Sequence, residues 1–280
     1  MHKWIVPALL LVIVTVLPKP AAGAEPVALS PTIESGYRQM YNLDFDGAHA
    51  TFRAWEAAHP EDAVGPVSNA AAYLFSEFNR LHILESELFV DNDKFAKRKK
   101  LLPDPQVRAA FDGELNRGDE IAGRALAKSP QDANALFAKV LANGLRGDYA
   151  ALVEKRNMAG LGYMKAGRLL AQKLLALDPS YYDAYLAIGV ENYLLGLSSA
   201  PVRWFLRLGG AETNKEDGIA KLRLTAEKGR YLAPYARLLL AVAALRDRDR
   251  DTARRLLSGL ADEFPQNPLY RKELAQLQLP

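Results

Sequence analysis

The sequence predicts an all-α fold, an α-solenoid of antiparallel helix pairs with about twelve helices. Helical periodicity runs through almost the whole chain, and the alternating apolar and polar runs that indicate strands are nearly absent. One helical pattern also recurs, with a small residue, apolar residues four and seven positions later, and then a proline. It occurs at Ala48, Phe52, Trp55 and Pro60; Gly118, Ala122, Ala125 and Pro130; Gly167, Ala171, Leu174 and Pro179; and Ala253, Leu257, Leu260 and Pro265. The small residue lets two helices approach closely, and the proline ends the helix. A single unit of this kind cannot bury its own apolar face, so we expect the units to stack on one another.

Capping residues and prolines give the order and limits of the helices. Ser30 before Pro31 and Asn267 before Pro268 place a capping side chain ahead of a proline at the first helical position, and Gly229 is a C-terminal stop. The expected helices span residues 31–42, 46–59, 66–89, 105–128, 131–145, 149–177, 181–196, 200–208, 214–229, 232–246, 250–263 and 267–277. We expect consecutive helices to pair as antiparallel hairpins.

The first 24 residues have the pattern of a secretory leader. An apolar run from Trp4 to Leu17 is followed by Ala22-Gly23-Ala24, the small-residue pattern that signal peptidase cleaves. The alternative is an uncleaved anchor, but Pro7 and Pro18 leave the run shorter than the roughly 20 residues of a spanning helix. We expect residues 1–24 to be a signal peptide and residues 25–280 to form one domain. This domain would be periplasmic in a Gram-negative source and secreted otherwise.

Composition narrows the classes of partner and site. The chain has no cysteine, which excludes disulfides, thiolate metal sites and thiol nucleophiles. Its 36 Lys and Arg face 33 Asp and Glu, and removal of Lys3 and Lys19 with the leader brings the two counts almost level. A near-neutral chain gives no long-range attraction for nucleic acid, so we expect no nucleic-acid partner.

The repeated unit resembles the tetratricopeptide repeat (TPR), a family that pairs two helices in each unit of about 34 residues. The second helix of that unit matches at the four places given above. The first helix matches best at Tyr185, Ile188 and Gly189, which take the large, large and small positions of the family, and more loosely around Gly36. The resemblance implies a scaffold that binds a segment of another protein in a concave groove. With the leader pattern and the absence of a catalytic motif, we expect an exported, non-catalytic scaffold. A small-ligand carrier with its pocket inside the superhelix is the alternative function.

The resemblance also implies which residues line the groove, because the first helix of each unit faces it. Tyrosines there offer a large rigid contact, and polar residues inside apolar helices face either a groove or solvent. The candidate groove residues are Tyr37, Tyr41, Asn143, Tyr185, Glu191, Asn192 and Tyr193. For the tyrosines, packing between neighbouring helices is the alternative.

Two long connectors interrupt the regular pattern. Residues 196–213 contain an aromatic insert with Arg203, Trp204, Phe205 and Arg207, which would act as a lid or touch a membrane surface, or else fold back to seal the core. Residues 91–104 contain a basic cluster. A solvated loop is the favoured reading of that cluster, and contact with lipid headgroups or an acidic partner is the alternative.

Searches for chemical sites find no motif. His82 and Glu85 have helical spacing, but two ligands do not make a metal site. The segment that begins at Gly160 has Lys165 where a dinucleotide loop needs its third glycine. We therefore expect no catalytic residue, no metal site and no cofactor.

Overall fold

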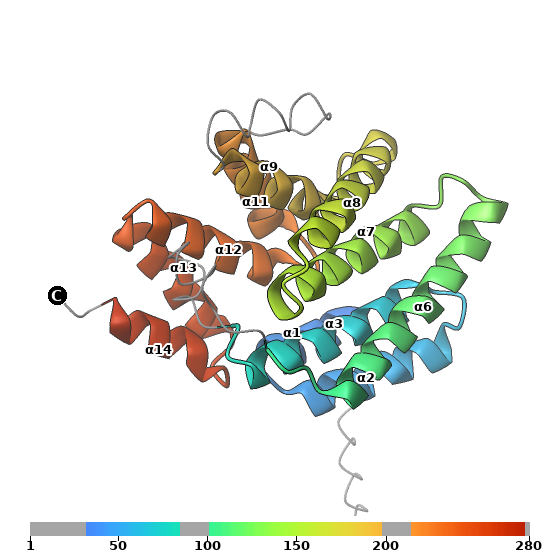
Figure 1. Ribbon diagram of the computed structural model, residues 1–280, viewed down its shortest axis with the longest axis horizontal. Helices are drawn as coiled ribbons and strands as arrows, with labels where there is room; N and C mark the ends of the chain where they lie inside the picture. Colours follow the sequence, from blue (N-terminus) through green and yellow to red (C-terminus); the bar gives the residue numbers. More distant parts are fainter. Residues whose placement is uncertain (1–31, 85–100, 198–213, 278–280) are drawn as a thin grey trace, which may run out of the picture. The chain divides into compact units, whose positions relative to one another are not determined.

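A computed structural model describes residues 32–84, 101–197 and 214–277 (Figure 1). These residues form eleven α-helices, one π-helix and one 3₁₀-helix, and they contain no strand. The α-helices are α1 (Ile33–Tyr41), α2 (Phe45–Ala58), α3 (Val64–Arg80), α6 (Pro105–Lys128), α7 (Ala133–Asp148), α8 (Asn157–Leu177), α9 (Tyr185–Gly196), α11 (Lys215–Lys228), α12 (Ala233–Arg246), α13 (Arg250–Glu263) and α14 (Pro268–Gln276). The predicted all-α class is confirmed. The predicted leader and the predicted helix at 200–208 lie outside the described residues.

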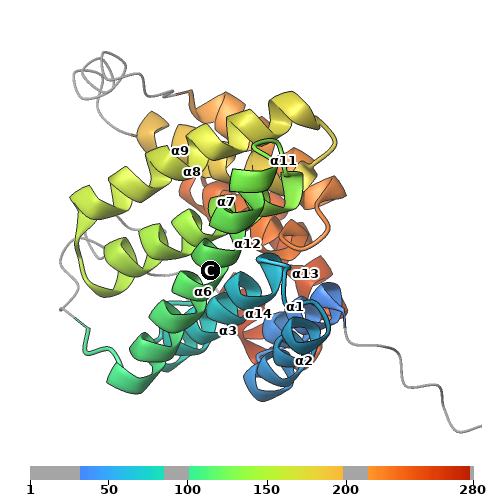
Figure 2. The same cartoon turned by 90° about the vertical axis from the view of Figure 1, so that its right-hand side faces the viewer.

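Each helix contacts the next one along the chain. The helices fall into five pairs followed by α14, namely α1–α2, α3–α6, α7–α8, α9–α11 and α12–α13, and Figure 2 shows α7 and α8 side by side. We call α1, α3, α7, α9 and α12 the first helices, and their partners the second helices. The first helix α3 also contacts the first helices α1 and α7.

The repeated sequence pattern explains how the second helices pack. Ala48, Gly118, Gly167 and Ala253 are all buried, and a Cβ at Gly118 would lie only 2.5 Å from Cγ2 of Val67. The fifth second helix, α11, has a related pattern in its buried Gly218, Leu222 and Thr225, with a polar residue at the last of these positions. Here Arg230 stands where the other four copies have proline, so the sequence pattern alone did not reveal this copy.

The turns that contain the four prolines share the same two backbone hydrogen bonds. After α2, the amide of His59 donates to the carbonyl of Trp55 (2.8 Å), and the amide of Asp62 donates to the carbonyl of His59 (3.0 Å). The corresponding two bonds recur around Pro130, Pro179 and Pro265. Proline fits this position because its own missing N–H is not needed by the turn.

The turns that follow four of the first helices each contain a non-glycine residue with a left-handed backbone: Leu43, His82, Lys155 and Arg248. The turn after α3 corrects the helix predicted at 66–89, since α3 ends at Arg80. The amide of Ile83 donates to the carbonyl of Phe78 (2.8 Å) and the amide of His82 donates to that of Asn79 (3.2 Å), which together form a Schellman cap. Glycine is the usual sequence signal for this cap, and it is missing here.

The helix predicted at 149–177 is also divided. A π-helix from Tyr149 to Val153 continues α7, and the chain then turns at Lys155 (φ 57°) before α8 begins at Asn157. The amide of Arg156 donates to the carbonyl of Ala150 (2.7 Å) across this turn. The periodicity of the sequence continues through the turn, so it gave no sign of the break.

Candidate binding surface

Two of the predicted groove residues, Tyr37 and Tyr41 on α1, lie in the core. Their exposed fractions are 2% and 5%. The ring of Tyr37 stacks on that of Tyr231 with centroids 5.5 Å apart, and the hydroxyl of Tyr41 donates to the carbonyl of Tyr231 at 3.1 Å. The expectation that they line an open groove is therefore corrected, because residues from the other end of the chain cover them. Packing between helices, the alternative, describes both tyrosines.

Aromatic rings from several first helices meet in this part of the core. The ring of Phe75 on α3 packs edge-on against Tyr235 on α12 (5.5 Å), and that of Phe137 on α7 packs against Tyr181 (4.8 Å). A cavity of about 30 Å³ lies beside them, lined by Tyr41, Phe75, Tyr235 and mostly apolar neighbours. That volume holds about one water molecule, whereas pockets for small ligands usually exceed roughly 300 Å³.

Two carboxylates sit at the edge of the aromatic core. Asp183 is buried and accepts three backbone N–H groups, from Arg230 (2.9 Å), Tyr231 (3.1 Å) and Leu232 (2.8 Å). It thereby fixes the turn that leads into α12. Asp148, at the end of α7, accepts a long hydrogen bond from the Tyr235 hydroxyl (3.4 Å), and burial raises the pKa of Asp148 to about 7.

Asn143 and Tyr185 bond to their own chain segments rather than to each other. Nδ2 of the partly buried Asn143 donates to the carbonyl of Lys139, one turn earlier on α7 (2.8 Å). The hydroxyl of Tyr185 donates to the carbonyl of Pro179 (3.2 Å) in the turn before α9. The structure does not bring these two residues together into one site.

The three consecutive candidates on α9 are all buried. The carboxylate of Glu191 accepts from Nε of Arg168 on α8 (2.9 Å), and Nδ2 of Asn192 donates to Asp217 on α11 (2.6 Å). Tyr193 is 7% exposed, and burial raises the pKa of its phenol. Glu191 and Asn192 bond to the neighbouring helices α8 and α11 and Tyr193 is buried, which corrects the expectation that the three residues face a groove.

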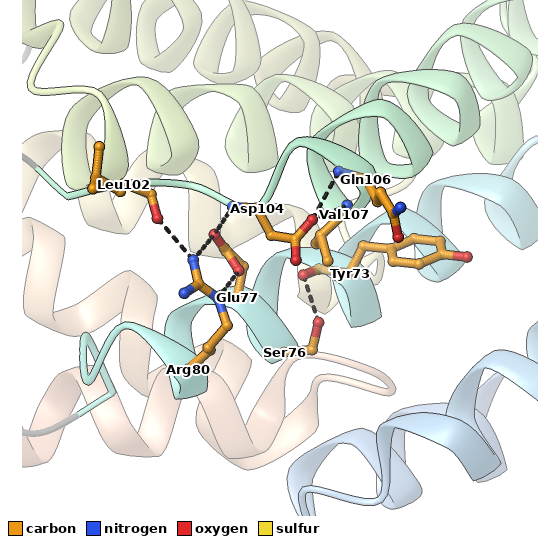
Figure 3. A network of polar contacts seen from close by, with 8 residues as sticks. All are labelled: Tyr73, Ser76, Glu77, Arg80, Leu102, Asp104, Gln106 and Val107. Atoms are coloured by element: carbon orange, nitrogen blue, oxygen red, sulfur yellow. Dashed lines mark hydrogen bonds and ion pairs between the residues drawn. The ribbon is translucent and has the colours of Figure 1, made fainter.

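The insert residues Arg203, Trp204, Phe205 and Arg207 lie outside the described residues, as does the basic cluster of Lys94, Lys97, Arg98, Lys99 and Lys100. The chain that follows this cluster is held by a polar clamp (Figure 3). Glu77 is 1% exposed, forms a two-point ion pair with Arg80 (2.8 and 2.7 Å), and accepts the amide of Asp104 (2.8 Å). Arg80 also donates to the carbonyl of Leu102 (2.8 Å). The clamp therefore ties the start of α6 to the end of α3.

A buried polar chain that sequence reasoning missed connects α2, α3 and α6. Nδ1 of His49 lies 2.6 Å from Oδ1 of Asn69, whose Nδ2 donates to Glu114 (3.0 Å). Because the Asn69 amide donates to a carboxylate, its oxygen is the acceptor and Nδ1 of His49 carries the proton. Burial lowers the pKa of His49 and raises that of Glu114. The three residues come from separate helices, so no local spacing announces them.

Exposed apolar side chains gather on one pair of neighbouring helices. Six large apolar side chains are exposed in the described part of the chain, and five of these lie on α8 or α9: Met158, Tyr163, Leu169, Leu177 and Leu194. Met158 is 81% exposed and Leu169 is 51% exposed. Met158, Leu169 and Leu177 lie along one side of α8, and a concentration of exposed apolar residues on one surface marks an interaction site. This surface is the candidate binding site.

The sequence does hold a signal for this surface. The 21 residues of α8 are apolar on more than one side, whereas a helix that faces solvent on one side has a polar outer stripe. The repeated pattern assigns only Gly167, Ala171 and Leu174 of this segment to the packed side of the helix. The apolar residues of α8 that do not belong to its packed side would have indicated that its outer side is apolar as well.

Among the described residues, no three His, Asp or Glu side chains lie close enough together to hold a metal ion. None of the helices in the described ranges is both long and apolar enough to cross a membrane. Neither a protein-family model nor a curated protein matches the sequence.

Proposed function

We propose that this chain is an exported, non-catalytic interaction scaffold, a TPR-like α-solenoid that docks a segment of another protein on the outer surface of α8 and α9. The repeat assignment is supported by the small residue buried in all five second helices and by the shared turn at the four prolines. Export is supported by the leader pattern of residues 1–24.

The observation that carries the docking proposal is the exposure of large apolar side chains on α8 and α9, of which Met158, Leu169 and Leu177 lie along one side of α8. Each of these residues would lose contact with water in a complex, which favours association by about 25 cal/mol for each Å² of apolar surface removed. Tyr37 and Tyr41 are already buried against Tyr231, so they contribute to the stability of the scaffold and not to partner binding.

Site-specific photo-crosslinking in the source cells tests this function. A photoreactive phenylalanine analogue is placed at Gly162 on α8 or, as a matched control, at Gly259 on α13. Both glycines are exposed, and a Cβ at either one meets no atom within 4 Å, so both positions accept a large side chain.

We expect one dominant protein adduct from position 162 and none of the same mass from position 259. Mass spectrometry identifies the partner in the adduct. The adduct should be lost when the substitution Leu169→Asp is introduced into the same protein. Without that substitution, it should form again when the purified partner is mixed with the purified protein. Equal adduct patterns at the two positions, or no protein adduct at position 162, would overturn the proposal.

A further inference from the structure

From the charge and shape of this surface, we infer that the docked segment is an acidic amphipathic helix lying along α8. This inference rests on the proposed function and names the chemistry of its partner. It concerns one line of exposed residues, which we call the α8 face: Met158, Gly162, Lys165, Leu169, Lys173 and Leu177. Their spacing of three or four residues places them on one side of the helix.

The α8 face carries positive charge and no negative charge. The segment Asn157–Leu177 contains no Asp or Glu. Lys165 and Lys173 are exposed, and the ammonium of Lys173 donates to a neutral acceptor, the carbonyl of Pro130 (2.9 Å). The third cation of α8, Arg168, is buried against Glu191 and does not reach this face. A partner gains attraction here by presenting carboxylates.

The other second helices show that this composition is a property of α8 and not of all outer surfaces in the protein. The exposed residues of α13 mix both signs, for example Arg254 paired with Asp251 (2.8 Å), and α13 exposes no large apolar side chain. Helix α11 likewise exposes both Glu216 and Arg223. Mixed charges of this kind keep a surface soluble without selecting a partner.

The shape of the face fits a helix. From Met158 to Leu177 it extends about 29 Å at 1.5 Å per residue, the length of a partner helix of about five turns. Gly162 leaves open space between the protruding Met158 and Leu169, which allows an apolar side chain of the partner to approach the backbone. This is the arrangement in which an amphipathic helix lays its apolar side on a complementary surface.

Two other occupants fit the charge and exposure less well. A second copy of the chain in antiparallel orientation would bring lysines toward lysines, which is unfavourable. An anionic membrane would attract the lysines, but a helix that lies in a membrane buries a broad apolar side, whereas α8 uses its other sides to contact α7 and α9.

Fluorescence anisotropy with the purified full chain tests the inference. The probe is a labelled 21-residue helical peptide with leucines along one side and glutamates flanking them. Its controls are the same peptide with lysine in place of glutamate and one with the same composition in scrambled order. The protein variants are Leu169→Asp and Lys173→Glu on the α8 face, with Ser258→Asp and Arg254→Glu as matched controls on α13.

We expect the acidic peptide to bind at least about tenfold more tightly than either control peptide. Leu169→Asp and Lys173→Glu should each weaken it about tenfold or more, with both α13 variants unchanged. Added salt should weaken it as well, because exposed charges are screened. Circular dichroism melts confirm that each variant is folded, and Lys173→Glu provides a second test if Leu169→Asp is not.

Equal binding of the acidic and basic peptides would overturn the inference, as would binding that survives both α8 substitutions. Leu169-dependent flotation with anionic phosphatidylglycerol vesicles in the absence of peptide binding would assign the face to a membrane. A Leu169-dependent dimer in light scattering would assign it to a second copy. A protein adduct at position 162 with no binding of the acidic peptide would reject the partner chemistry alone, whereas loss of both would reject the docking function.

Discussion

The hydroxyl of Tyr41 donates a hydrogen bond to the carbonyl of Tyr231 at 3.1 Å, across 190 positions of sequence. Nearby, Nδ2 of Asn267 donates to the carbonyl of Tyr41 (2.9 Å), and Arg38 forms an ion pair with Glu263 (3.2 Å). Helix α1 is therefore bonded to α13 and to the start of α14. In a repeat protein whose units contact only their neighbours, such contacts are not required, so they tie the ends of the chain into one cooperative unit.

Tyr41→Phe should lower the free energy of unfolding by about 1 to 2 kcal/mol, because it removes one hydrogen bond and leaves a partly buried carbonyl without this donor. Urea unfolding followed by circular dichroism measures the change. The matched control is Tyr185→Phe, whose hydroxyl bonds to the nearby Pro179 carbonyl at a more exposed position and should cost at most about 0.5 kcal/mol. Equal costs for the two variants would show that the long-range bond adds no stability.

Asp183→Ala should be more damaging, since three backbone N–H groups lose their acceptor at once. We expect a loss of about 3 kcal/mol or more in the free energy of unfolding. Asp183→Asn keeps one oxygen and should lose less. Thermal melts of both variants measure the order, and Asp178→Ala, which alters only the turn at Ser180, provides the control. Equal melting temperatures for the Ala and Asn variants would show that the oxygen kept in the Asn variant adds no stability, which contradicts its role as an acceptor of these backbone N–H groups.

The raised pKa of Asp148 predicts a pH dependence of stability with a definite sign. The ordinary value of this carboxyl is 3.8 and burial raises its pKa to about 7, so the folded protein holds the proton more tightly than the unfolded chain does. The free energy of unfolding should therefore fall as the pH rises from about 4 to about 7, by an amount on the order of 2 to 4 kcal/mol, and then level off.

Asp148→Asn removes this dependence. The variant should match the parent protein near pH 4 and be the more stable of the two at pH 8, as measured by urea unfolding at a series of pH values. The control is Asp251→Asn, because the side chain of Asp251 is 80% exposed. A constant difference between Asp148→Asn and the parent across this pH range would show that burial does not shift the pKa of Asp148.

The second helices could be read from the sequence because their signals are local. A small residue, two apolar residues and a proline act within one helix and its turn, so Ala48 to Pro60 already contains what the structure shows there. The copy in α11 was missed because Thr225 replaces the second apolar residue and Arg230 replaces the proline. The four left-handed turn residues, Leu43, His82, Lys155 and Arg248, could not be predicted for a similar reason, since none of these positions has the expected glycine.

The candidate site could not be read in the same way, because burial depends on which segments meet in space. The positions of Tyr37 and Tyr41 in the sequence predict that they line a groove. In the structure Tyr231 packs on Tyr37 and Phe264 packs on Tyr41, and both come from distant parts of the chain. Leu169 is an apolar residue in a helix and would be expected in the core, but no segment in the described part of the chain covers it fully. Periodicity tells which residues share a face and not which face meets another helix.

The left-handed turn at Arg248 gives a prediction about the backbone alone. Arg248 has φ 62° and is exposed, and its amide donates to the carbonyl of Leu245 (3.1 Å), so the turn and not the side chain defines this position. A residue with a Cβ pays about 1 to 2 kcal/mol in this conformation, and glycine avoids that penalty at a smaller cost in unfolded-chain entropy. Arg248→Gly should therefore raise the free energy of unfolding by roughly 0.5 to 1 kcal/mol. Arg248→Ala removes the side chain but keeps the Cβ, so it should leave the free energy of unfolding nearly unchanged. Urea unfolding measures both variants. If Arg248→Ala gains as much stability as Arg248→Gly, charge around Asp247 and Asp249, rather than backbone strain, sets the stability of this turn.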